Sequence, residues 1–368
     1  MRVPELTLRH DRGITRHWLG AGALEEAGEA LGAWLRDRHL FVVTDPLVRE
    51  LHEESLEGLL ETPGEVSFLE VPRGESAKTV SEAEGLWRTM LRAGGKRDSR
   101  LLTFGGGSVG DLGGYVAGAF LRGIEYGHLP TTVLAQVDAA IGGKTAVDLP
   151  EGKNSVGLFH HPAFVVGEVS WLSTLTDGER RAGLFEAVKM GFLLDPELFA
   201  RIEGTLDPIL DGEPGAMAPV VGEAAAVKIG VVERDLEEAG SRKLLNFGHT
   251  LGHALEAATG YEALRHGEAV GYGMLFALEL AEARALSGRE ADRLRGVVDR
   301  IGLPPLPEVT VEELMVLVSR DKKAREEGVT WVLPRTLGEG GLEVIEEDEV
   351  RTRLESWIRE VVSGGDDR

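Results

Sequence analysis

Cysteine is absent from the 368 residues of this sequence. Its absence excludes disulfide bonds, a cysteine nucleophile and zinc held by thiolates. Any bound metal would therefore use nitrogen and oxygen ligands. That donor set favours a catalytic metal site over a structural zinc site.

Positive charge is also scarce. The chain has 40 lysines and arginines against 62 aspartates and glutamates, for a net charge of -22 at pH 7. Binding to nucleic acid requires a basic surface, so we expect no nucleic-acid partner. In so acidic a chain, lysines and arginines that gather inside glycine-rich or histidine-rich motifs indicate anion-binding sites.

Long hydrophobic runs form the third absence. We find no window with the ~18 apolar residues needed to cross a bilayer, and the first residues, Met1 to Leu6, lack the apolar segment of a secretory signal. We therefore expect no membrane partner and a cytoplasmic location. The hydrophobic content of 42% and the length are sufficient for two domains with a large core.

Apolar runs and helical patterns alternate in the first half of the chain. Residues 40–45, 65–71 and 100–104 read as buried strands, and residues 79–93 read as a helix between the last two. This order predicts a parallel sheet flanked by helices. After residue 176, amphipathic helical patterns dominate, at 179–194, 214–234, 250–258, 268–285, 289–301 and 311–320, with one late strand at 329–333. We predict an α/β Rossmann-like domain at 1–176 and a mostly α-helical domain at 177–368.

The third strand runs into a glycine loop, Gly105-Gly106-Gly107-Ser108-Val109-Gly110-Asp111. Between a strand and a helix, such glycines let the backbone approach a pyrophosphate at the helix N-terminus. The motif alone is a weak signal, and a tight turn without a ligand remains an alternative. Asp45 ends an earlier strand, and it could reach an adenosine ribose because the ends of parallel strands share one edge.

Three further loops combine glycines, hydroxyls and lysines. They are Pro130-Thr131-Thr132, Asp138-Ala139-Ala140-Ile141-Gly142-Gly143-Lys144-Thr145 and Gly152-Lys153-Asn154-Ser155. A single lysine after a glycine is usually surface charge. Several such loops together favour an anionic ligand.

Histidines are concentrated in one later stretch. His249 and His253 lie four residues apart in a helical pattern, and His266 follows in the motif His266-Gly267-Glu268. Residues at i and i+4 share a helical face, and histidine is the commonest nitrogen ligand of zinc. Spacing alone pairs His249 with His253 on one metal.

Taken in order, these motifs resemble the 3-dehydroquinate synthase family of sugar phosphate cyclases. The resemblance runs from Asp45 to Lys323. It is carried by the glycine loop and by Arg122-Gly123, Pro130-Thr131-Thr132, Gly142-Gly143-Lys144, Lys153-Asn154, Glu186-Ala187-Val188-Lys189, Arg242, Asn246, Gly248-His249-Thr250, His253, His266-Gly267-Glu268 and Asp321-Lys322-Lys323.

The resemblance implies a dehydroquinate synthase-like fold, with NAD on the N-terminal domain, a metal on the helical domain and substrate in the cleft between them. It implies that zinc or cobalt is held by Glu186, His249 and His266. It assigns His253 to the substrate, as a proton-transfer or hydrogen-bonding group, and not to the metal.

The resemblance also implies the remaining contacts. Those to the substrate come from Arg122, Asp138, Lys144, Asn154, Lys189, Lys228, Arg242, Asn246 and one of Lys322 and Lys323. Those to NAD come from Asp45, Glu75, Lys78, Gly105, Gly106, Gly107, Ser108, Asp111, Thr131, Thr132, Lys144, Lys153, Thr174, Leu175 and Glu179. Arg122 is implied to reach the phosphate bound by a neighbouring subunit, which predicts a homodimer. Taken alone, Lys78 and Glu179 read as solvated helix charges and Asn246 as a helix cap.

The implied substrate is a phosphorylated sugar acid, 3-deoxy-D-arabino-heptulosonate 7-phosphate. NAD would oxidise C4, phosphate would leave by elimination, the hydride would return, and an aldol step would close the ring to 3-dehydroquinate. The enzyme would be a phosphate-eliminating carbon–oxygen lyase with no net use of NAD.

Six positions depart from the family pattern. Ala139 and Ala140 replace serines, Asp148 stands where asparagine is common, Leu47 replaces a polar residue, and His160-His161 replaces a more usual Tyr-Gln. The alternatives are a sibling cyclase acting on a sugar phosphate without a carboxylate, a metal- and NAD-dependent polyol dehydrogenase, and a non-catalytic metal-stabilised subunit. The intact Lys189, Lys228 and His253 argue against the last, because none is needed merely to hold a fold.

Overall fold

The computed structural model describes residues 3–284, 286–320 and 328–365. The chain forms two compact units. The first contains residues 1–176 and 212–236, and the second contains residues 177–211 and 237–368. The chain first passes between the units after Thr176, at the boundary predicted from the sequence. The segment 212–236, predicted to belong to the helical domain, instead packs with the first unit.

The first unit is built on a seven-stranded sheet with the order β1-β2-β9-β6-β5-β3-β4. β1 pairs antiparallel with β2, and the other pairs are parallel. The strands are β1 (Glu5–His10), β2 (Gly13–Gly20), β3 (His39–Thr44), β4 (Glu65–Glu70), β5 (Arg100–Gly105), β6 (Tyr126–Pro130) and β9 (Phe164–Glu168), with a separate hairpin of β7 (Lys144–Leu149) and β8 (Gly152–Phe159). The predicted parallel sheet and its strands β3, β4 and β5 are confirmed.

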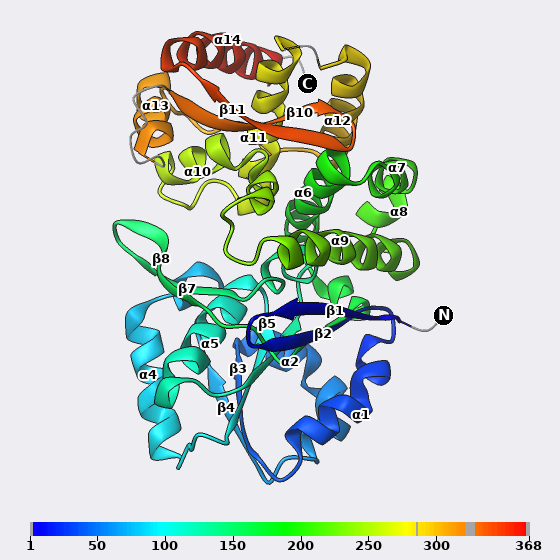
Figure 1. Cartoon of the computed structure of the whole chain (residues 1–368), viewed down its shortest axis with the longest axis vertical. Helices are drawn as coiled ribbons and strands as arrows, with labels where there is room; N and C mark the ends of the chain where they lie inside the picture. Colours follow the sequence, from blue (N-terminus) through cyan, green and yellow to red (C-terminus); the bar gives the residue numbers. More distant parts are fainter. Residues whose placement is uncertain (1–2, 285, 321–327, 366–368) are drawn as a thin grey trace. The chain divides into compact units, whose positions relative to one another are not determined.

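Helices cover both faces of this sheet. They and the shorter turns are α1 (Ala23–Leu35), α2 (Pro46–His52), η1 (Glu53–Leu56), α3 (Glu57–Leu60), η2 (Gly74–Ala77), α4 (Val80–Arg92), α5 (Gly107–Ala119), η3 (Phe120–Arg122), η4 (Ala135–Ala139), η5 (Val169–Thr174) and α9 (Pro214–Arg234). Alternate residues of β3 enter different cores. Leu40 and Val42 pack with α1, whereas Phe41 and Val43 pack with α4 and α5. Figure 1 shows α1 on one side of the sheet and α4 and α5 on the other.

The sheet reverses its winding direction at β3. From β3 the chain moves outward to β4, and β5 then pairs on the other side of β3 and leads to β6. In doubly wound sheets, ligands bind beyond the carboxyl ends of the strands at such a switch point. Asp45 follows β3 and the glycine loop follows β5, so the two features singled out from the sequence flank the switch point.

Helix α9 accounts for the altered domain division. It contacts β1, β2, η4 and η5 of the first unit, and Val220, Val221, Ala224 and Val232 are buried. By length and composition it could also cross a membrane, with a mean hydropathy of 1.5 over its most apolar window. The prediction that no such window exists is therefore wrong. Half of that window is buried inside the protein, which accounts for its apolar residues as those of a core helix.

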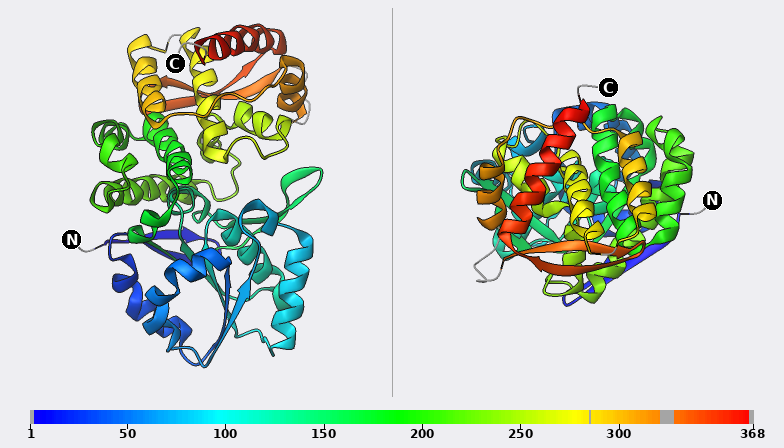
Figure 2. Two further views of the ribbon diagram at one scale, coloured as in Figure 1. Left: turned by 180° about the vertical axis from the view of Figure 1, so that it is seen from behind. Right: turned by 90° about the horizontal axis from the view of Figure 1, so that it is seen from above.

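The second unit is mainly helical. Its elements are α6 (Asp177–Leu194), α7 (Pro196–Gly204), α8 (Leu206–Leu210), η6 (Ser241–Asn246), α10 (His249–Ala258), α11 (His266–Glu282), α12 (Gly288–Ile301), α13 (Val311–Arg320), β10 (Val329–Thr336), β11 (Glu339–Ile345) and α14 (Glu347–Gly365). β11, which the sequence did not predict, pairs antiparallel with β10. The hairpin lies beside α11, which α14 also contacts (Figures 1 and 2).

Two buried histidines of the first unit make its stability depend on pH. Burial lowers the pKa of His17 and of His128 to about 4, from about 6.5 in an unfolded chain. The unfolded state therefore binds more protons between these values, so stability is complete above pH 6.5 and is lost as pH falls toward 4. We expect each histidine to contribute up to about 3 kcal/mol to this loss.

Urea unfolding at a series of pH values measures this dependence. A His128→Asn variant should show a shallower fall of unfolding free energy between pH 7 and pH 4.5 than the wild type. An unchanged slope would contradict the assignment.

Candidate metal and anion site

Glu186 and Lys189 form an ion pair inside α6. Every residue from Ala182 to Leu193 is buried, so α6 is a core helix and not the amphipathic helix that the sequence predicted. The Glu186 side chain is 0% exposed, and its Oε1 accepts no hydrogen bond from any residue that the structure describes. A buried carboxylate oxygen without such a bond is costly unless another group, such as a cation, compensates it.

Two histidines converge on the same oxygen. Nε2 of His249, the first residue of α10, lies 3.6 Å from Glu186 Oε1, and Nε2 of His266, the first residue of α11, lies 3.5 Å from it. One ligand atom from each of the three residues lies within 4.8 Å of the others. His249 Nδ1 is 3.2 Å from the Phe247 carbonyl oxygen. Donation to that carbonyl leaves Nε2 with a lone pair toward Glu186.

Burial and the charges within this triad shift the pKa values of all three residues. Burial alone would raise the pKa of Glu186, but the charge of Lys189 and the two histidines hold it well below its ordinary value. Burial lowers the pKa of His249 well below its ordinary value, so its ring is neutral. Burial would also lower the pKa of His266, yet the neighbouring carboxylates of Glu186 and Glu256 raise it to about 10, so a metal that binds Nε2 would displace a proton.

His253 borders the triad but is exposed. Its ring centroid lies 5.2 Å from that of His249 and 5.8 Å from that of His266. Spacing paired His249 with His253, and the geometry instead gathers His249 with Glu186 and His266. A second group with metal-binding spacing contains His253, Glu256 and His266, so His266 belongs to both sets.

The motif His266-Gly267-Glu268 divides into three structural roles. His266 joins the triad. A Cβ on Gly267 would overlap with the carbonyl oxygen of Ala182 on α6, so only glycine permits this close approach of the two helices. Glu268 accepts from the backbone N–H of Arg265 at 2.7 Å and so caps α11.

Two more predicted anion-binding residues lie on η6 of the same unit. Arg242 is buried, and Asn246 donates through Nδ2 to Glu238 Oε1 at 2.7 Å. Glu238 was not predicted. Its backbone is left-handed, with φ of 59°. Glu238 lies in the loop between α9 and η6, and no sequence pattern indicated its contact with Asn246. Lys322 and Lys323 lie outside the described residues.

Lys228 and Asp138 meet within the first unit. The Lys228 ammonium donates to both the backbone oxygen and Oδ1 of Asp138, each at 2.6 Å. Asp138 lies on η4, a single turn of π-helix, a geometry that is frequent at functional sites. The contact exists because α9 packs on η4, so the altered domain division places Lys228, a predicted substrate residue, in the first unit.

The glycine loop forms a closely packed cradle. A Cβ on Gly105 would lie 2.8 Å from Val109 Cγ2, and one on Gly106 would lie 3.1 Å from Thr132 Cγ2. A side chain at Gly105 would therefore overlap with Val109, and one at Gly106 would crowd Thr132. Asp45 is the N-cap of α2 and accepts through Oδ1 from the backbone N–H of Leu47 and Val48, at 3.0 and 3.1 Å.

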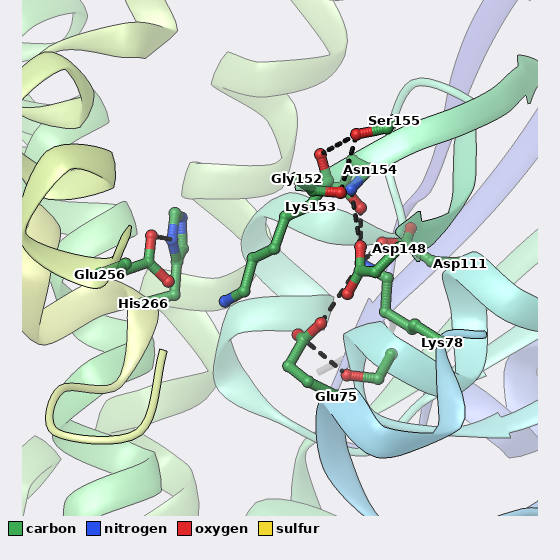
Figure 3. A network of polar contacts seen from close by, with 11 residues as sticks. Glu75, Lys78, Asp111, Asp148, Gly152, Lys153, Asn154, Ser155, Glu256 and His266 are labelled. Carbon is green, nitrogen blue, oxygen red and sulfur yellow. Dashed lines mark hydrogen bonds and ion pairs between the residues drawn. The ribbon is translucent and has the colours of Figure 1, made fainter. Parts of the chain in front are cut away.

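A charged network surrounds Lys78 (Figure 3). Its ammonium lies 2.9 Å from Asp111 Oδ2, 2.6 Å from Asn154 Oδ1 and 3.6 Å from Glu75 Oε2. Burial would lower the pKa of Lys78, but Asp111 and Glu75 raise it above its ordinary value. Burial raises the pKa of Asp111. Asn154 has a φ of 53°, a left-handed conformation that asparagine tolerates. These four predicted site residues are thus adjacent.

The other predicted residues are distributed over both units. Ser108 donates to Glu75 at 3.2 Å, and Thr174 Oγ1 lies 3.0 Å from His52 Nε2. The first unit also contains Gly107 at the start of α5, buried Thr131 after β6, Lys144 at the start of β7, Lys153 on β8, Leu175 after η5 and the exposed Arg122 on η3. Glu179 lies in the first turn of α6, in the second unit.

The departures from the family pattern have local structural partners. Asp148 Oδ1 accepts from the backbone N–H of Asn154 at 2.6 Å and lies 3.9 Å from the Lys78 ammonium, so its extra charge is paired. Ala139 Cβ would lie 3.3 Å from a Cβ on Gly107, so a small side chain fits beside the glycine loop. His160 stacks on Tyr126 with ring centroids 5.1 Å apart.

Sequence and structure comparisons agree on the family. The family model for the 3-dehydroquinate synthase N-terminal region matches residues 68–182, and the model for the C-terminal region matches residues 183–324. A 3-dehydroquinate synthase from Symbiobacterium thermophilum is 42% identical over 88% of this chain and 91% of its own, and one from Pelotomaculum thermopropionicum is 40% identical over 87% and 88%.

The fold has close relatives among solved structures. The structure of 2-epi-5-epi-valiolone synthase from Streptomyces hygroscopicus, with NAD+ and Zn2+ bound, matches with a TM-score of 0.86 at 27% identity, covering 98% of this chain and all of that one. The Rossmann-like first unit and the helical second unit are thus those of the sugar phosphate cyclases. This chain belongs to the 3-dehydroquinate synthase family.

Proposed function

We propose that this protein converts 3-deoxy-D-arabino-heptulosonate 7-phosphate to 3-dehydroquinate and phosphate, as a lyase that closes a carbocyclic ring. The observation that carries the proposal is the Glu186–His249–His266 triad, with Glu186 fully buried beside Lys189. Membership of the 3-dehydroquinate synthase family supports the choice of substrate, because the identity to named synthases exceeds that to the sibling cyclase.

Glu186, His249 and His266 would hold the metal. Nitrogen and carboxylate ligands fit zinc or cobalt, and the valiolone synthase contains Zn2+. Glu186 Oε1, buried and without a hydrogen bond from the described residues, supplies the negative ligand. A bound divalent ion supplies Lewis acidity toward substrate hydroxyls. Lys189 then neutralises the second oxygen of Glu186, since the two side chains form an ion pair.

The switch point of the first unit would hold NAD. The cradle of Gly105 and Gly106 lets backbone N–H groups at the start of α5 approach a pyrophosphate. Bound NAD supplies reversible hydride exchange with one substrate carbon. The Lys78 network would fix Glu75, Asp111 and Asn154 at the same edge of the sheet, since all three contact the Lys78 ammonium.

The remaining polar groups would bind and orient the substrate. The buried Arg242 offers a planar fork for a carboxylate or phosphate. Lys228 holds the Asp138 carboxylate in place, which could then accept from substrate hydroxyls. His253, exposed beside the triad, would donate a proton to the substrate or accept one from it.

Arg122 supports the homodimer as part of this proposal. Leu121 and Arg122 are consecutive residues with left-handed backbones, at φ of 49° and 70°. Each costs of order 1–3 kcal/mol, and such strain gathers at functional sites. The exposed Arg122 side chain would reach the phosphate bound by a neighbouring subunit.

A coupled assay tests the proposed reaction. The protein is mixed with NAD, zinc and the heptulosonate phosphate, and phosphate release and NADH absorbance are followed together. We expect one phosphate released for each substrate consumed and no net NADH, because the hydride returns within the same cycle.

Each other outcome has a meaning. Net NADH accumulation would indicate a polyol dehydrogenase. No phosphate from this substrate, with turnover of sedoheptulose 7-phosphate or glucose 6-phosphate, would indicate a sibling cyclase.

A further inference from the structure

His266 lies between two carboxylates, one at each ring nitrogen. Its Nε2 is 3.5 Å from Glu186 Oε1, and its Nδ1 is 3.1 Å from Glu256 Oε2. The two nitrogens of an imidazole point in different directions, so one ring cannot direct both toward one ion. Figure 3 shows Glu256 beside the Nδ1 edge of the ring. Glu256 therefore meets His266 on the side away from the triad.

Glu256 is a buried carboxylate on α10, the helix that begins with His249. Its side chain is 2% exposed. It follows His249 by seven residues on α10, about two helical turns, so the two side chains lie on the same helical face. A buried carboxylate is retained only where hydrogen bonds or charges compensate its desolvation. The His266 ring supplies one such contact.

We propose that Glu256 is a positioning residue of the metal centre. It accepts the Nδ1–H of His266, fixes the tautomer whose Nε2 lone pair is available to a metal, and makes that nitrogen a stronger metal ligand. The Phe247 carbonyl is the corresponding group for His249, since it lies 3.2 Å from Nδ1 of that ring. This group is neutral, whereas Glu256 is charged. The inference rests on the proposed metal role of the triad and adds the group that sets its metal affinity.

The competing arrangement uses Glu256 as a direct ligand, together with His253 and His266, since their ligand atoms also lie within 4.8 Å of one another. That arrangement would occupy Nδ1 of His266 and leave Glu186 buried without a metal. It also relies on His253, which is exposed. The buried Glu186 and the orientation of His249 favour the triad with Glu256 behind it.

Metal affinity distinguishes these roles without requiring turnover. The Kd of the full-length protein for Zn2+ is measured by competition with a chromophoric chelator, for the wild type, Glu256→Ala, Glu256→Gln and Glu262→Gln. Glu262 is an exposed carboxylate six residues further on and serves as the matched control. We expect Glu256→Ala to weaken binding by about 10–100-fold, and Glu256→Gln to weaken it less, because the amide oxygen still accepts from Nδ1. Glu262→Gln should bind like the wild type.

A spectroscopic measurement separates positioning from ligation. The visible spectrum of the Co2+ form should keep its band shape in both Glu256 variants at saturating metal. The 15N shifts of His266 should show protonated Nδ1 in the wild-type Zn2+ form and in Glu256→Gln.

Three results would overturn the inference. Wild-type affinity in Glu256→Ala would remove the role of Glu256 while leaving the metal triad in place. A second such result is a Glu256→Ala variant that loses its metal and its Co2+ spectrum while Glu186→Gln keeps both. That result would make Glu256 a ligand. A wild-type protein that binds no metal would refute the proposed metal site itself.

Discussion

Replacing His266 by alanine is expected to lower kcat by about three orders of magnitude or more and to abolish stoichiometric metal binding. The substitution leaves Glu186 and His249 as the remaining members of the triad. A metal contributes several kcal/mol of charge stabilisation, and each 1.4 kcal/mol changes the rate about tenfold. Turnover and metal content by atomic absorption measure both effects, and chelation of the wild type should reproduce the loss.

Readdition of Zn2+ or Co2+ is the control for this experiment. It should restore activity to the chelated wild type but not to His266→Ala, while circular dichroism shows that the variant is folded. Full activity in metal-free protein would refute the assignment of the metal to these three residues.

Replacing Gly267 by alanine is expected to destabilise the second unit by several kcal/mol and to disrupt the metal triad. The new Cβ would lie 2.6 Å from the carbonyl carbon of Ala182, and a backbone atom cannot move aside as a flexible side chain can. α11 would have to shift from α6, and His266 at its first residue would move away from Glu186. Overpacking of this kind commonly costs 1–3 kcal/mol or more.

Gly296 provides the matched control. It lies within α12, and a Cβ there would meet nothing within 4 Å. Because alanine favours a helix by about 1 kcal/mol over glycine, Gly296→Ala should raise the melting temperature slightly and leave metal binding unchanged. Wild-type melting and metal affinity in Gly267→Ala would contradict the packing argument.

The strands β3, β4 and β5 were predictable because continuous apolar runs bounded by turns are typical of strands buried on both faces. β11 was not, because Gly340, Gly341 and two glutamates interrupt its pattern, and only pairing with β10 makes it a strand. α9 was predicted as an amphipathic helix of the second domain, and only its tertiary contacts with β1, β2 and η4 show that it is a core helix of the first unit.

The chemistry of the site divides in the same way. Residue types and their order predicted the carboxylate, histidines and lysines of the metal and anion sites, because such chemistry requires those side chains and local motifs hold them in fixed order. Their grouping was decided by tertiary structure. Sequence spacing compares only residues on one helix, so it paired His249 with His253. The packing of α6, α10 and α11 instead brings His249 to Glu186 and His266. It also buries Glu256 behind His266, a contact that depends on how two helices pack and that no local pattern encodes.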